Sequence, residues 1–255
     1  GPIERGEIIF ENVRFAYPGR PDQEALAGID LVIPAGSTLA VVGSTGSGKS
    51  TLVQMVPRLT DTTTGRILID GIDVRERRLA DIRSGIGFVP QETFLFSDTV
   101  AANIALGVEE ATERQIREMA EAVRLSVDID EFPGGYATLV GERGVTLSGG
   151  QKQRTAIARA ILRRPRILIL DDALSSVDTR TEEEILLRIR EDMQSRTTLL
   201  VSHRVSTVRH ADRIIVLERG RIVESGTHDE LLAKNGRYAD LERRQRLREE
   251  IEATA

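Results

Sequence analysis

The stretch Gly43–Thr51, which reads GSTGSGKST, constrains the fold of this chain more than any other segment. An apolar run, Thr38–Val42, precedes it, and an apolar segment with helical character, Leu52–Val56, follows it. Glycines adopt backbone angles that are closed to other residues, so this loop can wrap tightly and point its N–H groups inward. With the positive end of the following helix dipole, these donors form an anion site. Strand, glycine-rich turn and helix are the context of the phosphate-binding pattern G-x-x-x-x-G-K-[ST], which predicts binding of a nucleoside triphosphate.

Individual residues of this loop have expected roles. Lys49 adds a positive point charge for the terminal phosphates, and the hydroxyl of Ser50 is a ligand for Mg²⁺. An ordinary glycine- and serine-rich loop is the alternative, and the strand before it and the helix after it argue against that reading. The residues expected to contact the nucleotide are Gly43, Ser44, Thr45, Gly46, Ser47, Gly48, Lys49, Ser50 and Thr51.

The composition is typical of a globular protein, with 40% hydrophobic and 29% charged residues in a chain of 255. That length suffices for one large domain or for two lobes that share a core. The longest apolar runs, such as Ile167–Leu170, have the length of a strand, and none approaches the roughly twenty residues that span a bilayer. The absence of cysteine excludes disulfides and thiolate metal sites. A net charge of −5 gives no indication of a nucleic-acid surface.

Apolar spacing predicts a sheet around the phosphate loop and a helical lobe inserted into that sheet. Residues 7–17 alternate apolar and polar side chains, as a half-buried strand does. From Thr112 onward the spacing becomes helical, and Gln115 stands where it can complete a capping box with Thr112. Further strands are expected at 29–33, 66–71, 86–91, 166–171 and 197–202, a hairpin at 214–218 and 222–224, and helices at 112–124, 151–164 and 181–193.

The prediction is one α/β domain, residues 1–255, built on a phosphate-loop sheet. Its parts are a sheet core at about 1–91 and 166–240, a helical subdomain at about 92–165 and a charged C-terminal helix at 241–255.

Two further motifs extend the predicted phosphate chemistry. Asp171 ends the apolar strand 166–171, and a carboxylate at the C-terminal edge of such a sheet can hold Mg²⁺ through water. An aspartate that caps a turn is the alternative. Leu147–Gln151, which reads LSGGQ, places a serine and two glycines at a predicted helix start and offers a second anion site. One γ-phosphate can satisfy both phosphate sites if two such domains face each other head to tail.

In order and spacing, these motifs resemble those of the ATP-binding cassette (ABC) ATPases. The resemblance covers essentially the whole chain and rests on Gly43–Thr51, Gln91, Leu147–Gln151, Asp171 and His203. Within that family the chain resembles the nucleotide-binding domain of an exporter, because it contains Pro90–Phe96, Asn103–Ile104 and Val140–Gly144. The resemblance implies a P-loop NTPase fold, with a RecA-like parallel sheet core, an antiparallel β part and an inserted α-helical subdomain.

The resemblance also implies roles in the chain's own ATP site. Tyr17 would stack on the adenine ring, whose face suits an aromatic side chain. His203 would contact the γ-phosphate and help to order the attacking water. The expected Mg²⁺ ligands are Ser50, Gln91 and, through water, Asp171. The expected catalytic residues are Lys49, Gln91, Asp172 and His203.

Other positions would meet partners. The family implies that Ser148, Gly149, Gly150 and Gln151 contact the nucleotide held by a partner domain. It implies that the loop across the dimer interface contains Ser175, Ser176 and Asp178. The segments 91–96 and 140–144 would meet the coupling helices of membrane domains and carry motion rather than chemistry.

Asp172 departs from the family pattern, in which active members carry a glutamate that polarises the attacking water. The aspartate side chain is one methylene shorter, and a base must lie within about 2.6–3.2 Å of the proton that it takes. A misplacement of about 1 Å can cost on the order of a hundredfold in rate. The substitution resembles one half of a heterodimeric exporter, which pairs a weak ATP site with a competent one. A slow homodimer with a tolerated variant is the alternative.

The expected function is that of the motor domain of an ABC exporter at the cytoplasmic face of a membrane. This ATP hydrolase would bind ATP and Mg²⁺, close head to tail on a second nucleotide-binding domain and drive transmembrane domains, without nucleic-acid binding or lipid insertion of its own. A regulatory module that holds ATP with negligible turnover is a second hypothesis, motivated by Asp172. A soluble ABC ATPase of DNA repair or translation is a third, which the lack of sustained heptads and of a basic patch disfavours.

Overall fold

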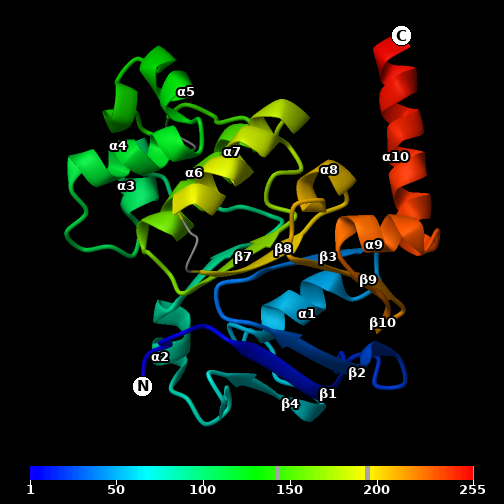
Figure 1. Cartoon of the computed structure of the whole chain (residues 1–255). Helices are drawn as coiled ribbons and strands as arrows, with labels where there is room; N and C mark the ends of the chain where they lie inside the picture. The colour runs from blue at the N-terminus through cyan, green and yellow to red at the C-terminus, as the bar shows by residue number, and fades with distance from the viewer. Residues whose placement is uncertain (142–143, 193–195, 255) are drawn as a thin grey trace.

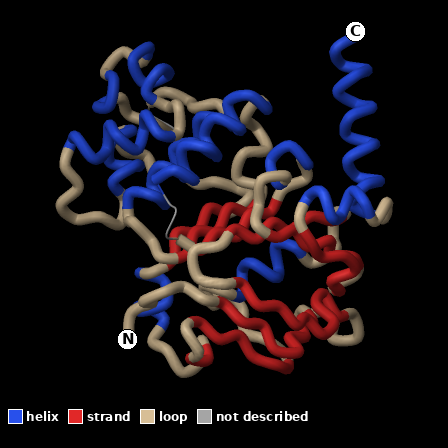
Figure 2. Tube along the Cα trace, viewed as in Figure 1, coloured by secondary structure: helices blue, strands red, loops and turns tan. Residues whose placement is uncertain are grey.

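The computed structural model describes residues 1–141, 144–192 and 196–254, and within these the strands form two sheets (Figures 1 and 2). The first sheet has four antiparallel strands in the order β2-β1-β4-β5, namely Glu24–Ile33, Ile8–Ala16, Thr64–Ile69 and Ile72–Asp73. The second has six strands in the order β10-β9-β3-β8-β7-β6, namely Arg221–Gly226, Arg213–Glu218, Thr38–Gly43, Thr197–Val201, Ile167–Asp171 and Ile86–Val89.

Five strands of the second sheet run parallel, and β10 pairs antiparallel with β9 at its edge. All five residues of β7 are buried, as expected of a parallel strand that is covered on both faces. The register aligns Val89 with Leu170 and Leu170 with Leu200. Parallel strands end at the same edge of a sheet. The residues that follow β3, β6, β7 and β8 therefore lie on one side of this sheet.

Separate apolar cores lie against the two faces of the six-stranded sheet. Helix α1 (Lys49–Met55) lies between the two sheets in Figure 1 and packs through Leu52 and Val53 with residues of β1 and β2. Helix α6 (Gly149–Leu162) packs in the other core through Ile157 and Ala158, together with residues of α7 (Thr179–Asp192). The helix after the phosphate loop and the helix after LSGGQ are therefore on opposite faces of the sheet.

The helical lobe falls between β6 and β7 in the chain. It contains α3 (Val100–Ala105), α4 (Glu113–Ala122), α5 (Ser126–Glu131) and α6, whereas α2 (Leu79–Ser84) precedes β6. The predicted capping box at Thr112 and Gln115 is present at the start of α4, so the local sequence correctly predicted where this helix begins.

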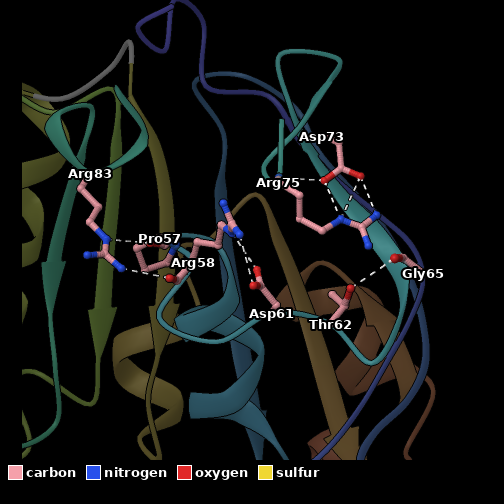
Figure 3. Close-up of polar contacts among 8 residues, drawn as sticks. All are labelled: Pro57, Arg58, Asp61, Thr62, Gly65, Asp73, Arg75 and Arg83. Atoms are coloured by element: carbon pink, nitrogen blue, oxygen red, sulfur yellow. Dashed lines mark hydrogen bonds and ion pairs between the residues drawn. The ribbon is translucent and has the colours of Figure 1, made fainter. Parts of the chain in front are cut away.

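A compact set of hydrogen bonds fixes the segment between α1 and β4 (Figure 3). Arg58 Nε donates to Asp61 Oδ1 over 2.7 Å. Arg83 of α2 donates to the carbonyl of Pro57 over 3.3 Å and to that of Arg58 over 3.0 Å. These bonds tie the C-terminal end of α1 to α2 and thereby hold the helix that carries Lys49.

The C-terminal part contains α8 (Val205–Val208), α9 (His228–Ala233) and α10 (Arg237–Thr254). Helix α10 begins at Arg237 rather than at 241, because Glu224 of β10 accepts hydrogen bonds from the N–H groups of Arg237 and Tyr238. Tyr238 is fully buried and its hydroxyl bonds to His228 Nδ1 over 2.8 Å, so the first turn belongs to the core. Residue 255 lies outside the described residues.

The predicted hairpin at 214–218 and 222–224 is confirmed as the antiparallel pair β9 and β10. In the described part of the chain, no helix combines the length and the apolar character that crossing a bilayer requires.

Candidate functional site

The phosphate loop connects β3 to α1 and depends on glycine at two close approaches. Gly43 has φ 152°, and a Cβ there would lie 2.2 Å from the carbonyl oxygen of Leu217. Gly48 has φ 104°, and a Cβ there would lie 2.5 Å from the carbonyl oxygen of Ala25. No side chain fits at either position without moving backbone, so the loop can keep this path only with glycine.

Lys49 is buried at the start of α1 and reaches back over the loop. Its Nζ donates to the carbonyl of Gly43 over 2.9 Å and to that of Ser44 over 2.8 Å. Burial lowers the pKa of Lys49, and the charges of Asp172 and Asp171 act in the opposite direction. The ammonium group is thus held within the loop and close to two carboxylates.

Ser50 and Asp171, predicted from segments far apart in the chain, are in direct contact. Ser50 Oγ donates to Asp171 Oδ1 over 3.0 Å. Asp171 ends β7 and is only 1% exposed. The pKa of Asp171 is raised, mainly by burial and also by the nearby charge of Asp172. The hydrogen bond from Ser50 and the charges of Lys49 and His203 oppose this shift in part.

These oxygens fit a magnesium ion. Mg²⁺ prefers oxygen ligands, and it usually binds through one or two carboxylates plus substrate phosphates and water rather than in an all-protein cage. A serine hydroxyl and one carboxylate in contact match that mode. It also accounts for the finding that no group of three or more His, Cys, Asp or Glu suited to a metal occurs among the described residues. Gln91 follows β6, the strand that pairs with β7, and its side chain is exposed at the same edge.

Asp172 and His203 face each other beside this site. His203 Nε2 lies 3.8 Å from Asp172 Oδ2, and the histidine side chain is about half exposed. Asp172 has φ 51°, a left-handed conformation that aspartate tolerates better than most residues. Both residues line one pocket, together with Ser175 and Glu182.

Tyr17 stands next to the phosphate-loop helix. Its hydroxyl and Thr51 Oγ1 are 2.8 Å apart in a hydrogen bond, and its ring makes an edge-to-face contact with Phe15. Tyr17 is 48% exposed, so its side chain is accessible to a base.

LSGGQ begins α6, as predicted, and forms a complete capping box. Ser148 Oγ accepts from the N–H of Gln151 over 3.2 Å, and the N–H of Ser148 donates to Gln151 Oε1 over 2.9 Å. Gln151 Nε2 also donates to Asp128 of α5 over 2.8 Å. The cap therefore fixes both side chains within the helical lobe.

The loop containing Ser175 and Ser176 packs directly on α6. Gln153 Nε2 donates to Ser175 Oγ over 2.9 Å, and its Oε1 accepts from the N–H of Ser176 over 2.9 Å. A Cβ at Gly150 would lie 2.9 Å from the carbonyl oxygen of Ser176. Asp178 ends this loop and accepts from the N–H of Thr181 in α7, so the loop is anchored to two helices.

A buried charge network that the sequence analysis missed lies behind His203. Glu182 is 2% exposed and accepts hydrogen bonds from Arg204 and from the hydroxyl of Thr207. Arg204 also donates to the carbonyls of Val177 over 2.8 Å and Ser175 over 3.1 Å. Burial raises the pKa of Glu182, while its bonds to Thr207 and Arg204 lower it. The only sequence signal for this network was that Arg204 directly follows His203.

The expected membrane-domain contacts form an exposed aromatic edge. Phe94 and Phe96 are exposed and pack edge to face with centroids 5.1 Å apart. Asn103 is buried and holds this segment by bonding both the N–H and the carbonyl of Phe96. Arg159 of α6 donates to the carbonyl of Phe94 over 3.1 Å. In the segment 140–144, Glu142 and Arg143 lie outside the described residues.

With this geometry in view, comparison with known proteins identifies the family. Residues 26–175 match the family described as "ABC transporter". The chain belongs to the ABC transporter family. It contains the ATPase domain of that family, with a P-loop NTPase fold, and both the predicted fold class and the family resemblance are confirmed.

Individual ABC relatives are similar over almost the whole chain. The Arabidopsis thaliana protein "ABC transporter B family member 24, mitochondrial" is 47% identical over 239 residues, which is 94% of this chain and 35% of the relative. The "ATP-dependent lipid A-core flippase" of Chromobacterium violaceum is 47% identical over 240 residues, 94% of this chain and 41% of the flippase. A solved bacterial Atm1-family ABC exporter with ATP bound has a TM-score of 0.91 and 43% identity, over 95% of this chain and 42% of that one. The chain thus spans less than half the length of these relatives.

Proposed function

We propose that the chain is the nucleotide-binding domain of an ABC exporter, which binds Mg·ATP and uses binding and hydrolysis to drive transport across a membrane. The observation that carries this proposal is the Ser50–Asp171 contact beside the buried Lys49. This contact places two oxygen atoms suited to Mg²⁺ next to the phosphate loop and its lysine. In this proposal Mg²⁺ neutralises charge on the phosphates, Lys49 binds the terminal phosphates, and Tyr17 stacks on the base.

The proposed active unit is a head-to-tail pair of nucleotide-binding domains. Helices α1 and α6 pack in different cores on opposite faces of the sheet, which supports an LSGGQ motif that serves a partner's nucleotide rather than the chain's own. The capped helix start at Ser148 presents N–H donors that suit an anion. A second domain facing this one would bring its γ-phosphate to that cap, and its own cap to the ATP held by this chain.

The proposed contact with membrane domains is the aromatic edge at Phe94 and Phe96. Exposed aromatic side chains on a rigid support are typical of protein interfaces. Asn103 and Arg159 provide that support by holding the backbone on both sides. The relatives named as a flippase and an exporter favour membrane domains as the partner and the cytoplasmic face of a membrane as the location.

The chain's own site is proposed to be slow because Asp172 replaces a glutamate. The carboxylate lies close to His203, but the missing methylene moves it back from the water that it would polarise. Pairing with a different chain that carries the glutamate would give one weak and one competent site. A slow homodimer is the alternative. The second candidate function is a regulatory module whose bound ATP stabilises a domain interface without being hydrolysed at a significant rate. The presence of Asp172 also favours this candidate.

The test is the ATPase rate as a function of protein concentration, for the chain and for Asp172→Glu. Head-to-tail pairing predicts a rate per molecule that rises with protein concentration, and Lys49→Ala should abolish it. A near-silent chain together with a fast Asp172→Glu variant supports the weak-site proposal. A rate that is already substantial and unchanged by Asp172→Glu removes the support for both the heterodimer and the regulatory module.

A further inference from the structure

The C-terminal helix α10 reaches the backbone that carries His203. Gln245 Oε1 accepts a hydrogen bond from the N–H of Val205 over 2.6 Å, across 40 residues of sequence. Val205 is the first residue of α8 and lies two positions after His203. Arg204, the residue at the N-cap of α8, makes no side-chain capping bond of its own. Gln245 therefore supplies, from another helix, an acceptor for one of the N–H groups that the start of a helix leaves without an intrahelical partner.

Helix α10 is placed firmly enough to act through this contact. Glu224 fixes its first turn by accepting from the N–H groups of Arg237 and Tyr238. Tyr238 is fully buried, and Leu241 packs against the same core as Val205 and Val208. Toward its C-terminal end α10 projects away from the body of the domain (Figure 1), and Leu247 and Ile251 are exposed. The anchored half thus contacts α8, whereas the other half projects from the domain.

Arg204, the residue that follows His203, is held by hydrogen bonds of its own. The guanidinium of Arg204 bonds to the buried Glu182 and to the carbonyls of Val177 and Ser175. The N–H of Arg204 bonds to Ser202 Oγ over 3.0 Å. The two residues that follow His203 are therefore both held, Arg204 by Ser202 and the Ser175 loop and Val205 by Gln245 of α10.

We propose that Gln245 is a positioning residue for His203, and that α10 controls ATP turnover by holding the start of α8. The proposal rests on the proposed role of His203 in hydrolysis. Loss of the Gln245 acceptor leaves the N–H of Val205 uncapped and frees the backbone two residues from the imidazole. Nucleotide binding uses the phosphate loop and Tyr17, which this contact does not touch.

The test uses three variants of the whole chain. Gln245→Ala removes the acceptor, Gln245→Glu keeps an acceptor oxygen at the same reach, and Leu247→Ala removes an exposed side chain two positions further along α10. The readouts are the NMR signal of the His203 imidazole, the affinity for the fluorescent analogue mant-ATP and the steady-state ATPase rate. The chain has three histidines, so the His203 signal can be assigned with a His203→Gln variant.

We expect Gln245→Ala to shift or broaden the His203 signal and to lower kcat roughly five- to tenfold, with mant-ATP affinity unchanged. Gln245→Glu should have the His203 signal and kcat of the parent, and Leu247→Ala should also leave these two readouts unchanged. An unchanged His203 signal in Gln245→Ala overturns the proposal, whatever the rate does. The NMR readout needs no turnover, so it tests the positioning even if the chain neither binds nor hydrolyses ATP, which would instead refute the proposed function.

Discussion

Ser50 Oγ donates to Asp171 Oδ1 over 3.0 Å, and this contact joins the start of α1 to the end of β7. It brings a buried carboxylate beside a second one, Asp172, with Lys49 as the nearby cation. Two carboxylates and one ammonium leave a net negative charge in a site of low exposure. Such a site attracts Mg²⁺, and a phosphate chain that binds together with the ion, at the expense of the stability of the free domain.

The first prediction is that Asp171→Asn stabilises the free domain while weakening Mg·ATP binding. Burial raises the pKa of Asp171 in the folded protein, so the fold disfavours its charged form. The resulting penalty is present above the folded-state pKa and absent below the ordinary aspartate pKa. At neutral pH we expect a gain of about 1 kcal/mol in the free energy of unfolding, vanishing toward pH 3.

Urea unfolding at pH 7 and pH 3 measures that gain, and mant-ATP titration with and without Mg²⁺ measures binding. Asn retains an oxygen that can accept from Ser50, so the variant isolates the charge. A loss of stability at neutral pH would show that attraction to Lys49 outweighs the cost of burial.

The second prediction concerns the length of the side chain at position 172. Asp172→Glu should raise the ATPase rate on the order of ten- to a hundredfold, because the carboxylate advances by one methylene toward the attacking water. The left-handed φ of 51° suits glutamate less well, so we expect a stability loss of no more than about 1 kcal/mol. Phosphate release at saturating Mg·ATP measures the rate. Asp172→Asn is the matched control and should stay as slow as the parent; a fast Asn variant would exclude a carboxylate base.

Local patterns in the sequence predicted the parts of the site that are built from neighbouring residues. The glycine positions at 43 and 48, the capping box at Thr112, the helix start at Leu147–Gln151 and the strand end at Asp171 are all short-range features, and the structure shows each of them. Ser50 and Asp171 meet because β3 and β7 are parallel strands of one sheet, and parallel strands end at the same edge.

Contacts between distant helices were not predictable in this way. Glu182 lies on a charged stretch that reads as a solvated helix face, yet it is buried because Arg204 and Thr207 lie opposite it. Gln245 belongs to the C-terminal helix predicted only from its charge, yet it accepts a hydrogen bond from the first residue of α8. Side-chain periodicity identifies the apolar face of a helix, but it carries no information about which polar residue pairs across a tertiary contact.

The third prediction separates two contributions of Tyr17. Tyr17→Ala should weaken ATP binding roughly tenfold, because stacking of a base on an aromatic side chain contributes about 1–3 kcal/mol. Tyr17→Phe keeps the ring and loses only the bond to Thr51, so its affinity should stay within about threefold of the parent. Isothermal titration with ATP and with inorganic triphosphate provides the measurement. The Ala variant should lose affinity for ATP but not for triphosphate, and equal losses for both ligands would place Tyr17 away from the base.

The fourth prediction is that Glu182 and Arg204 stabilise the fold as a pair. Arg204→Ala leaves a buried carboxylate without its cation, and we expect it to lower the free energy of unfolding by about 2–3 kcal/mol. The double variant with Glu182→Ala should be less destabilised than the sum of the two single variants, because no unpaired charge remains.

Urea unfolding of the two single variants and the double variant completes this thermodynamic cycle. The pH dependence gives an independent check of the Arg204→Ala result. Burial already raises the pKa of Glu182, and loss of Arg204 raises it further, so Arg204→Ala should regain stability relative to the parent as the pH falls and Glu182 becomes protonated. Arg209→Ala removes an exposed pair with Glu183 and serves as the control, with an expected change below about 0.5 kcal/mol. Additive losses with no pH dependence would show that Glu182 and Arg204 act through packing alone.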